Sequence, residues 1–136
     1  MSVGAPAARR AGAAVIRRIR PTDAARMRAL RLEMLADSPL AFLETVAEAA
    51  ARPHSDFAAW VAKSATGPEV ARFVAEADGR LVGHLGAMRD PANPNRTLIF
   101  GVYLTPAFRN RSLLEELMGA AAEWSRSAGR HELLLE

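Results

Sequence analysis

Apolar residues recur with a helical period in the first part of the chain. A short stretch at 15–20 predicts a strand, which must end at the proline that follows it. Met27, Leu30 and Met34 then fall at i, i+3 and i+7, which places them on one face of a helix that is expected to end near 37–39. This order predicts a strand followed by an amphipathic helix.

The period changes from helical to alternating near residue 70. Before that point we expect a helical turn or more within 40–46 and a short helix over 56–65. After it, two strands over 70–77 and 80–88 flank Asp78-Gly79, a dipeptide typical of a tight β-hairpin turn. The chain therefore combines helices with an antiparallel sheet.

A buried strand, a helix and a second buried strand are predicted next. The strands cover 97–104 and 131–136, and the helix covers 112–128, with Ser112 and Glu115 as a capping box. The buried stripe of this helix is predicted to consist of Leu114, Leu117, Ala121 and Trp124. Because a helix that crosses between two strands of one sheet connects parallel strands, these two strands should lie parallel.

A loop with two arginines precedes that helix. It places Arg109 and Arg111 beside the helix N-terminus, where the first backbone N–H groups lack intrahelical partners. These donors and the helix dipole favour an anion, and arginine matches phosphate in a bidentate geometry. The loop therefore predicts a phosphate site. The alternative is that both arginines only solvate the start of the helix.

Composition narrows the chemistry that the chain can perform. It contains no cysteine, and its three histidines are far apart in sequence, so no metal site is predicted. The isoelectric point of about 10.5 accompanies a net charge of only +3 and 6% aromatic residues, which argues against nucleic-acid binding. No stretch approaches the roughly 18 apolar residues of a membrane span.

The first residues are small and lack a long apolar stretch. We therefore expect a disordered tail over 1–12 rather than a secretory signal. A single domain over 13–136 and a cytoplasmic location are the corresponding expectations.

The segment VYLTPAFRNRS at 102–112 resembles the strand and pyrophosphate loop, Arg/Gln-x-x-Gly-x-Gly/Ala, of the GCN5-related N-acetyltransferase (GNAT) family. The resemblance runs from about residue 15 to residue 136 and includes IRP at 19–21, DSPLAF at 37–42 and ADGRLVG at 77–83. It implies an α/β (α+β) fold. The sheet would be mixed and mostly antiparallel, with helices on both faces and a parallel, splayed βαβ unit near the C-terminus, and it would lack the last strands.

The same resemblance implies acetyl-CoA as cosubstrate, no metal, and direct acetyl transfer to a primary amine of a small molecule or protein. Arg109 matches the leading arginine of the motif, and backbone groups of 109–114 would face the pyrophosphate. The main chain of 102–104 would pair with the pantetheine arm, and the N–H of Leu104 would stabilise the oxyanion. The implied cofactor-binding set is Val102, Tyr103, Leu104, Arg109, Asn110, Arg111, Ser112, Leu113 and Leu114.

The sequence departs from the family pattern in its chemistry. Ser112 and Leu114 stand where the motif has small residues, so weaker cofactor binding is expected. The strand at 97–101 holds no Asp or Glu, and His84 is expected to be an exposed or a hydrogen-bonded structural histidine rather than a base. The general base and acid are therefore unassigned.

The acceptor site is expected among the first helix, segment 39–65 and the loop 89–96. Asp37, Glu44 and Glu48 are candidates for attracting a cationic amine, although charges on helix surfaces are the simpler interpretation.

Family members usually continue beyond the fifth strand, where this sequence stops. The open apolar edge at Leu133–Leu135 therefore predicts either a homodimer formed through that edge or a shortened version of a longer protein. Two functions remain open: an acetyl-CoA-dependent N-acetyltransferase, and a catalytically silent GNAT-like module that binds coenzyme A or oligomerises.

Overall fold

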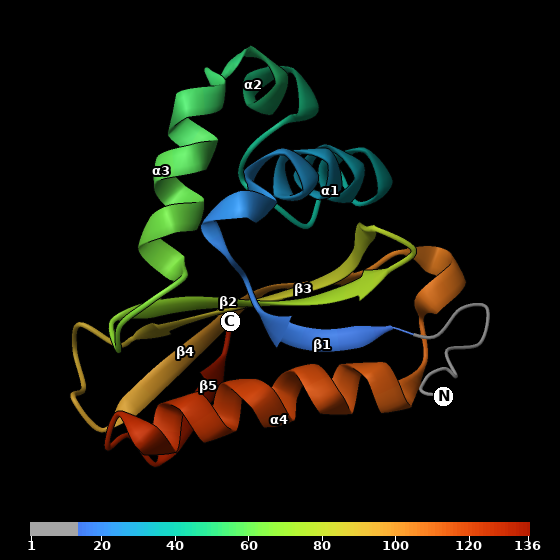
Figure 1. Ribbon diagram of the computed structural model, residues 1–136. Helices are drawn as coiled ribbons and strands as arrows, with labels where there is room; N and C mark the ends of the chain where they lie inside the picture. Colours follow the sequence, from blue (N-terminus) through green and yellow to red (C-terminus); the bar gives the residue numbers. More distant parts are fainter. Residues whose placement is uncertain (1–13) are drawn as a thin grey trace.

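The computed structural model describes residues 14–136, apart from the side chain of Arg111. The expected tail over 1–12 lies outside the described residues. A five-stranded sheet separates two helical layers, with α1, α2 and α3 over one face and α4 over the other (Figure 1). In chain order the elements are β1 Val15–Arg18, a 3-10 turn Pro21–Asp23, α1 Ala24–Asp37, α2 Val46–Ala51, α3 His54–Ser64, β2 Val70–Ala77, β3 Arg80–Arg89, β4 Arg96–Leu104, a 3-10 turn Pro106–Phe108, α4 Arg111–Ser127 and β5 Glu132–Leu135.

The strands lie in the order β1-β2-β3-β4-β5. The first four are antiparallel, and β5 runs parallel to β4, with Arg96 opposite Glu132 and Ile99 opposite Leu135. Both the hairpin and the parallel crossover that the sequence predicts are therefore confirmed. The hairpin turn has φ of 52° at Asp78 and 79° at Gly79, a left-handed pair that matches the twist of the flanking strands.

Helix α1 buries the apolar stripe that the sequence predicts for it. Met27, Leu30 and Met34 are at most 2% exposed and pack with β2 and β3 residues in one of the two cores. The second core lies between the sheet and α4, which contributes Leu113, Leu117 and Ala121 to it. Each face of the sheet thus has its own apolar core.

The N-terminus of α4 differs from the prediction. The N-cap is Asn110, whose Oδ1 accepts a hydrogen bond of 2.7 Å from the N–H of Leu113, so the capping box of Ser112 and Glu115 is wrong. Leu113 faces the sheet, whereas Leu114 is 37% exposed and leaves the buried stripe. Leu113 and Leu114 are both at helical spacing from Leu117, so either could be the buried one. The orientation of α4 on the sheet buries Leu113.

Two further apolar segments are exposed. Leu40 and Leu43 are fully exposed, and no helix covers 40–45, because Thr45 and Glu48 form a reciprocal capping box that starts α2 later. The strand β5 was expected to be buried, but it is the edge strand of the sheet, and Leu133, Leu134 and Leu135 are 38%, 41% and 64% exposed.

Candidate functional site

Three adjoining cavities lie along β4 and the helices on either side of it. The loop cavity, of about 530 Å³, is lined by Ser38, Val102, Tyr103, Leu104, Arg109, Asn110 and Leu114. It shares Val102 and Leu114 with the strand cavity of about 970 Å³, which also reaches Phe100, Met118 and Leu135. The strand cavity in turn shares Arg31, Glu44 and Arg52 with the arginine cavity of about 430 Å³. The shared linings show that the three cavities lie next to one another.

The loop cavity gathers six of the nine residues of the expected cofactor set, namely Val102, Tyr103, Leu104, Arg109, Asn110 and Leu114. Of the others, Leu113 is only 6% exposed and belongs to the core. Ser112 is exposed, with its Oγ 3.5 Å from a carboxylate oxygen of Glu116. The side chain of Arg111 lies outside the described residues.

At Leu104 the backbone N–H and C=O groups of β4 point away from β3. The N–H of the next residue, Thr105, donates to the carbonyl of Val82 at 2.9 Å, whereas the carbonyl of Leu104 accepts from Nε of Arg109 at 2.8 Å. Because the N–H and C=O of one residue point to the same side of a strand, the N–H of Leu104 also points away from β3. By the two-residue period of a strand, the N–H of Val102 has the same orientation.

The partner strand on that side ends early. The register between β4 and β5 covers Arg96 to Ile99, and within residues 14–136 the backbone of 100–104 has a strand partner only in β3. Two outward N–H groups therefore lie beside the cavities, one at Val102 and one at Leu104. The family resemblance implied both as main-chain partners of the pantetheine arm, and Leu104 alone as the oxyanion donor.

Arg109 is held across the loop cavity. Its Nε donates to the carbonyl of Leu104, its Nη2 pairs with Asp37 at the end of α1, and its guanidinium lies 5.4 Å from the ring centre of Tyr103. The side chain is nevertheless about half exposed. A guanidinium fixed in this way can present its remaining donors to an anion at the N-terminus of α4.

The start of α4 fits an anionic ligand in part. Within the described part of the chain the N–H of Ser112 donates to no protein acceptor, and the positive end of the 17-residue helix dipole lies there. The N–H of Leu113, by contrast, is used by the Asn110 cap. The residues therefore fit a phosphate-bearing group, with fewer free backbone donors than an uncapped helix would offer.

Tyr103 is tied to two carboxylates that the sequence did not connect with it. Its hydroxyl lies 2.9 Å from Glu33 and 3.1 Å from Asp37, and Thr105 donates to the same Glu33 oxygen at 2.6 Å. Burial and these carboxylates raise the pKa of Tyr103. The hydroxyl therefore remains protonated and is directed to α1, and this cluster fixes the end of β4 against that helix.

His84 is a structural residue, as expected. Because the carbonyl of Gly101 can only accept, Nδ1 of His84 donates to it at 2.6 Å, and Nε2 accepts from Nη1 of Arg72 at 2.9 Å. Burial and the charge of Arg72 lower the pKa of His84 to about 3. The ring lies 3.2 Å from where a Cβ of Gly101 would stand, and φ of 61° there also requires glycine. His84 is thus neutral and fully bonded, and it is not a free base.

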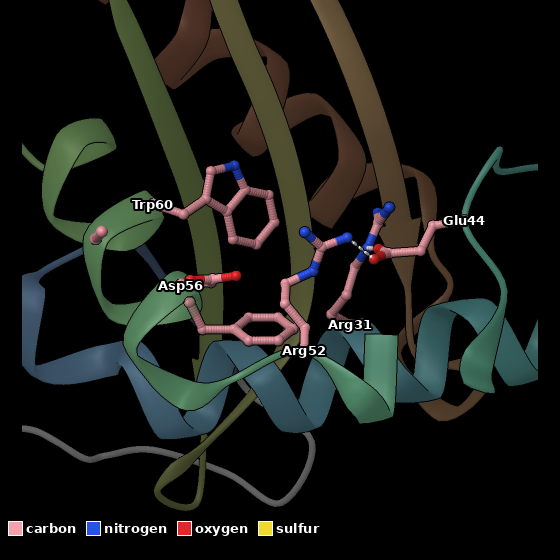
Figure 2. A pocket seen from close by; sticks show the side chains of 7 residues that line it. Arg31, Glu44, Arg52, Asp56 and Trp60 are labelled. Carbon is pink, nitrogen blue, oxygen red and sulfur yellow. Dashed lines mark hydrogen bonds and ion pairs between the residues drawn. The ribbon is translucent and has the colours of Figure 1, made fainter. Parts of the chain in front are cut away.

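The arginine cavity lies between α1, α3 and the segment before α2. Figure 2 shows the carboxylate of Glu44 between Arg31 and Arg52, with Asp56 and Trp60 of α3 beside them. Nε of Arg31 lies 3.2 Å from Glu44, and Arg52 pairs with the other oxygen of the same carboxylate. Burial would raise the pKa of Glu44, but hydrogen bonds from both arginines outweigh it, so the pKa falls below its ordinary range.

The acceptor region expected from the sequence is found in part. The first helix and segment 39–65 line the arginine and strand cavities, whereas the loop 89–96 contributes no lining residue to any of the three.

Among the described residues no group of three or more His, Cys, Asp or Glu side chains is arranged to hold a metal ion. None of the described helices is both long and apolar enough to cross a membrane.

Comparison with known proteins gives the family. The sequence model of the acetyltransferase (GNAT) family matches residues 31–136, so the chain belongs to the GNAT acetyltransferase family. No curated protein matches the sequence.

Solved structures share the fold at low identity. A GNAT-family acetyltransferase from Streptococcus pneumoniae has a TM-score of 0.72 at 19% identity, covering 90% of this chain and 73% of its own. The aminoglycoside N-acetyltransferase AAC(6')-Iy, in complex with the bisubstrate analogue CoA-S-monomethyl-acetylneamine, has a TM-score of 0.67 at 21% identity, covering 90% and 78%. An acetyltransferase from Clostridium acetobutylicum with acetyl-CoA has a TM-score of 0.66 at 11% identity, covering 90% and 80%.

Proposed function

We propose that the chain is an acetyl-CoA-dependent N-acetyltransferase that acetylates a primary amine. The observation that carries this proposal is the outward N–H of Leu104, which lies beside a cavity that begins at the N-terminus of α4. Family membership and the coenzyme A ligands of structures with the same fold support it.

Bound acetyl-CoA would supply an activated acetyl group. Arg109 and the start of α4 would hold its phosphates. The strand cavity, with the apolar side chains of Phe100 and Met118, would take the pantetheine arm. The N–H of Leu104 would stabilise the negative charge that develops on the thioester oxygen, and the N–H of Val102 would pair with the pantetheine arm.

The acceptor would enter from the side of the arginine cavity. That cavity adjoins the strand cavity, with which it shares the lining residues Arg31, Glu44 and Arg52. The aminoglycoside-derived ligand of one similar structure supports a small-molecule amine as the acceptor class. Holding the amine near the thioester supplies much of the acceleration in a direct transfer.

A second candidate is a module that binds the coenzyme without turnover. Three titratable groups near β4 are engaged: Glu33 and Asp37 accept hydrogen bonds from Tyr103, and His84 is bonded at both nitrogens. None of these three groups is therefore a free general base. Coenzyme binding with no thiol release over a broad panel of amines would favour this candidate.

Calorimetric titration of acetyl-CoA tests the proposed site. Arg109→Ala removes a charge-assisted contact, and such contacts contribute about 1.5–3 kcal/mol, so we expect roughly tenfold or greater weakening. Arg111→Ala tests the second loop arginine in the same way. Arg80→Ala, an exposed arginine in the hairpin, is the control and should bind as the wild type does. Equal affinities in all four proteins would exclude the pyrophosphate assignment.

A further inference from the structure

We infer that the acceptor is a small amine that also carries a carboxylate, and that Arg31 and Arg52 bind this carboxylate. The inference rests on the proposed function and identifies the class of acceptor. It follows from the donors that face the arginine cavity, from the charge around it and from its connection to the thioester site.

The two arginines are positioned by one carboxylate and keep free donors. Glu44 accepts from Nε of Arg31 and from Nη2 of Arg52. Within residues 14–136 the two Nη atoms of Arg31, and the Nε and Nη1 atoms of Arg52, have no hydrogen-bond partner. None of these four atoms is among the buried unsatisfied groups. They are therefore available in the cavity for a second carboxylate.

Packing limits the freedom of Arg31. Its guanidinium lies 5.2 Å from the ring centre of Phe42, and its side chain is only 17% exposed. A guanidinium that is already fixed loses little rotamer entropy when it binds a carboxylate. The ion pair with Glu44 thus prepares Arg31 for a ligand, and Arg52, at 45% exposed, can adjust to it.

The charge around the cavity is positive. Besides the pair with Glu44, Arg28 lies 5.1 Å from the ring centre of Phe57, and Arg72 lies 3.6 Å from that of Trp60; both rings line the cavity. Two arginines of the lining and two behind its aromatic rings thus outnumber the nearby carboxylates, which are Glu44 and Asp56 of the lining and Glu48 near Arg52. An amine that carried only positive charge would be repelled here, whereas an added carboxylate would balance the excess.

Arg72 strengthens this argument because no acidic side chain of residues 14–136 pairs with it. It is 5% exposed, its Nε lacks a hydrogen-bond partner, and within the described residues its charge forms no ion pair. It lies between Trp60 of the arginine cavity and Phe100 of the strand cavity. A buried positive charge at that point also favours the neutral form of an incoming amine, which is the form that attacks.

The expectation that acidic residues attract the amine is revised accordingly. Glu44 is shared by two arginines, and Asp37 pairs with Arg109 and accepts from Tyr103. These two carboxylates are therefore not free to hold an ammonium group, whereas Asp56 of the cavity lining has no ion pair among the described residues. The contacts of the cavity favour recognition of the acid end of the acceptor over its amine end.

The test compares amines that differ only in the carboxylate. The common α-amino acids and the ω-amino acids from β-alanine to 6-aminohexanoate are assayed beside their carboxamides, with kcat/KM expressed per concentration of free amine. Thiol release from acetyl-CoA is the readout, and the protein adds no background because it has no cysteine. We expect the best acid to exceed its carboxamide by about tenfold or more.

Arg52→Gln is the decisive variant because the side chain is about half exposed and its replacement spares the core. It should remove most of the preference for the acid, while Arg52→Lys should keep part of it. Arg126→Gln removes one exposed arginine of α4 and should leave the preference unchanged. Melting temperatures verify that each variant is folded.

The outcomes separate the inference from the proposed function. Carboxamides that react as well as their acids, or a preference that survives Arg52→Gln, would overturn the inference while acetyl transfer stands. Failure of every carboxylate-bearing amine to bind, in calorimetry with the coenzyme present, would also overturn it. Failure of acetyl-CoA itself to bind would instead remove the proposed function.

Discussion

At the scale of single residues, Leu114 distinguishes this chain from the family motif. It lines both the loop cavity and the strand cavity and is 37% exposed, at a position where the motif has a small residue. Leu114→Ala should therefore tighten acetyl-CoA binding by about 1 kcal/mol, or roughly fivefold, because phosphate and pantetheine could approach the helix more closely. Calorimetric titration of the variant beside the wild type measures this.

The neighbouring leucine is the matched control. Leu113 is 6% exposed in the core, so Leu113→Ala should lower the free energy of unfolding by about 2–5 kcal/mol without improving coenzyme affinity. Leu114→Ala should change stability far less. Weaker coenzyme binding by Leu114→Ala would show that Leu114 contacts the ligand instead of obstructing it.

The motif predicts which residues lie together at the end of β4, and their role in binding the coenzyme stays a prediction. Arg109, Asn110 and the end of β4 were expected together, and they line one cavity. The contacts of these residues could not be foreseen, because Glu33 and Asp37 come from a helix some 70 residues earlier in the chain. Nothing in local spacing links a tyrosine on β4 to carboxylates on α1.

At the scale of elements, His84 connects three strands. It lies on β3, donates to Gly101 of β4 and accepts from Arg72 of β2. The unfolded chain protonates this histidine near its ordinary pKa of 6.5, whereas in the folded protein its pKa is about 3. Between these values the unfolded state binds more protons, so stability is lost as the pH falls from 6.5 towards 3.

His84→Gln tests this linkage, because an amide can keep both hydrogen bonds without titrating. At pH 4.5 the buried histidine should reduce the free energy of unfolding by about 2–3 kcal/mol relative to neutral pH, and the variant should lack this component. Urea unfolding of both proteins at neutral and acidic pH measures it, and the carboxylates shared by the two proteins cancel in the difference. Parallel pH profiles would contradict the assignment.

Helices, strands and turns could be predicted from the sequence where a few neighbouring residues determine them. The hairpin turn at Asp78-Gly79 and the stripe on α1 are both as expected, since turn chemistry and helical spacing act over a few residues. The helical turn predicted within 40–46 was wrong because its formation depends on packing and not on local sequence alone. Its leucines are apolar in sequence yet have nothing to pack against, so hydrophobicity alone did not produce a helix there.

At the scale of the whole molecule, the two edges of the sheet differ. Edge strand β5 exposes three consecutive leucines, whereas edge strand β1 exposes Val15 and continues with Arg17 and Arg18. Charged side chains on an edge discourage pairing with another chain, and an exposed apolar edge favours it. The parallel crossover that produces β5 and the open apolar edge at Leu133–Leu135 were both predictable from the sequence, whereas the full burial expected for the strand was wrong, because burial depends on what covers a strand.

We therefore expect two copies of the chain to associate through β5. Leu134→Lys introduces a charge at the centre of that edge and should shift the protein towards the monomer, while changing stability little because the side chain is 41% exposed. Val15→Lys is the matched control on the opposite edge, where the side chain is 40% exposed, and it should associate as the wild type does. Sedimentation equilibrium over a range of concentrations measures the association constant of each protein. A wild type that stays monomeric throughout, or equal association constants for the wild type and Leu134→Lys, would exclude β5 as the interface.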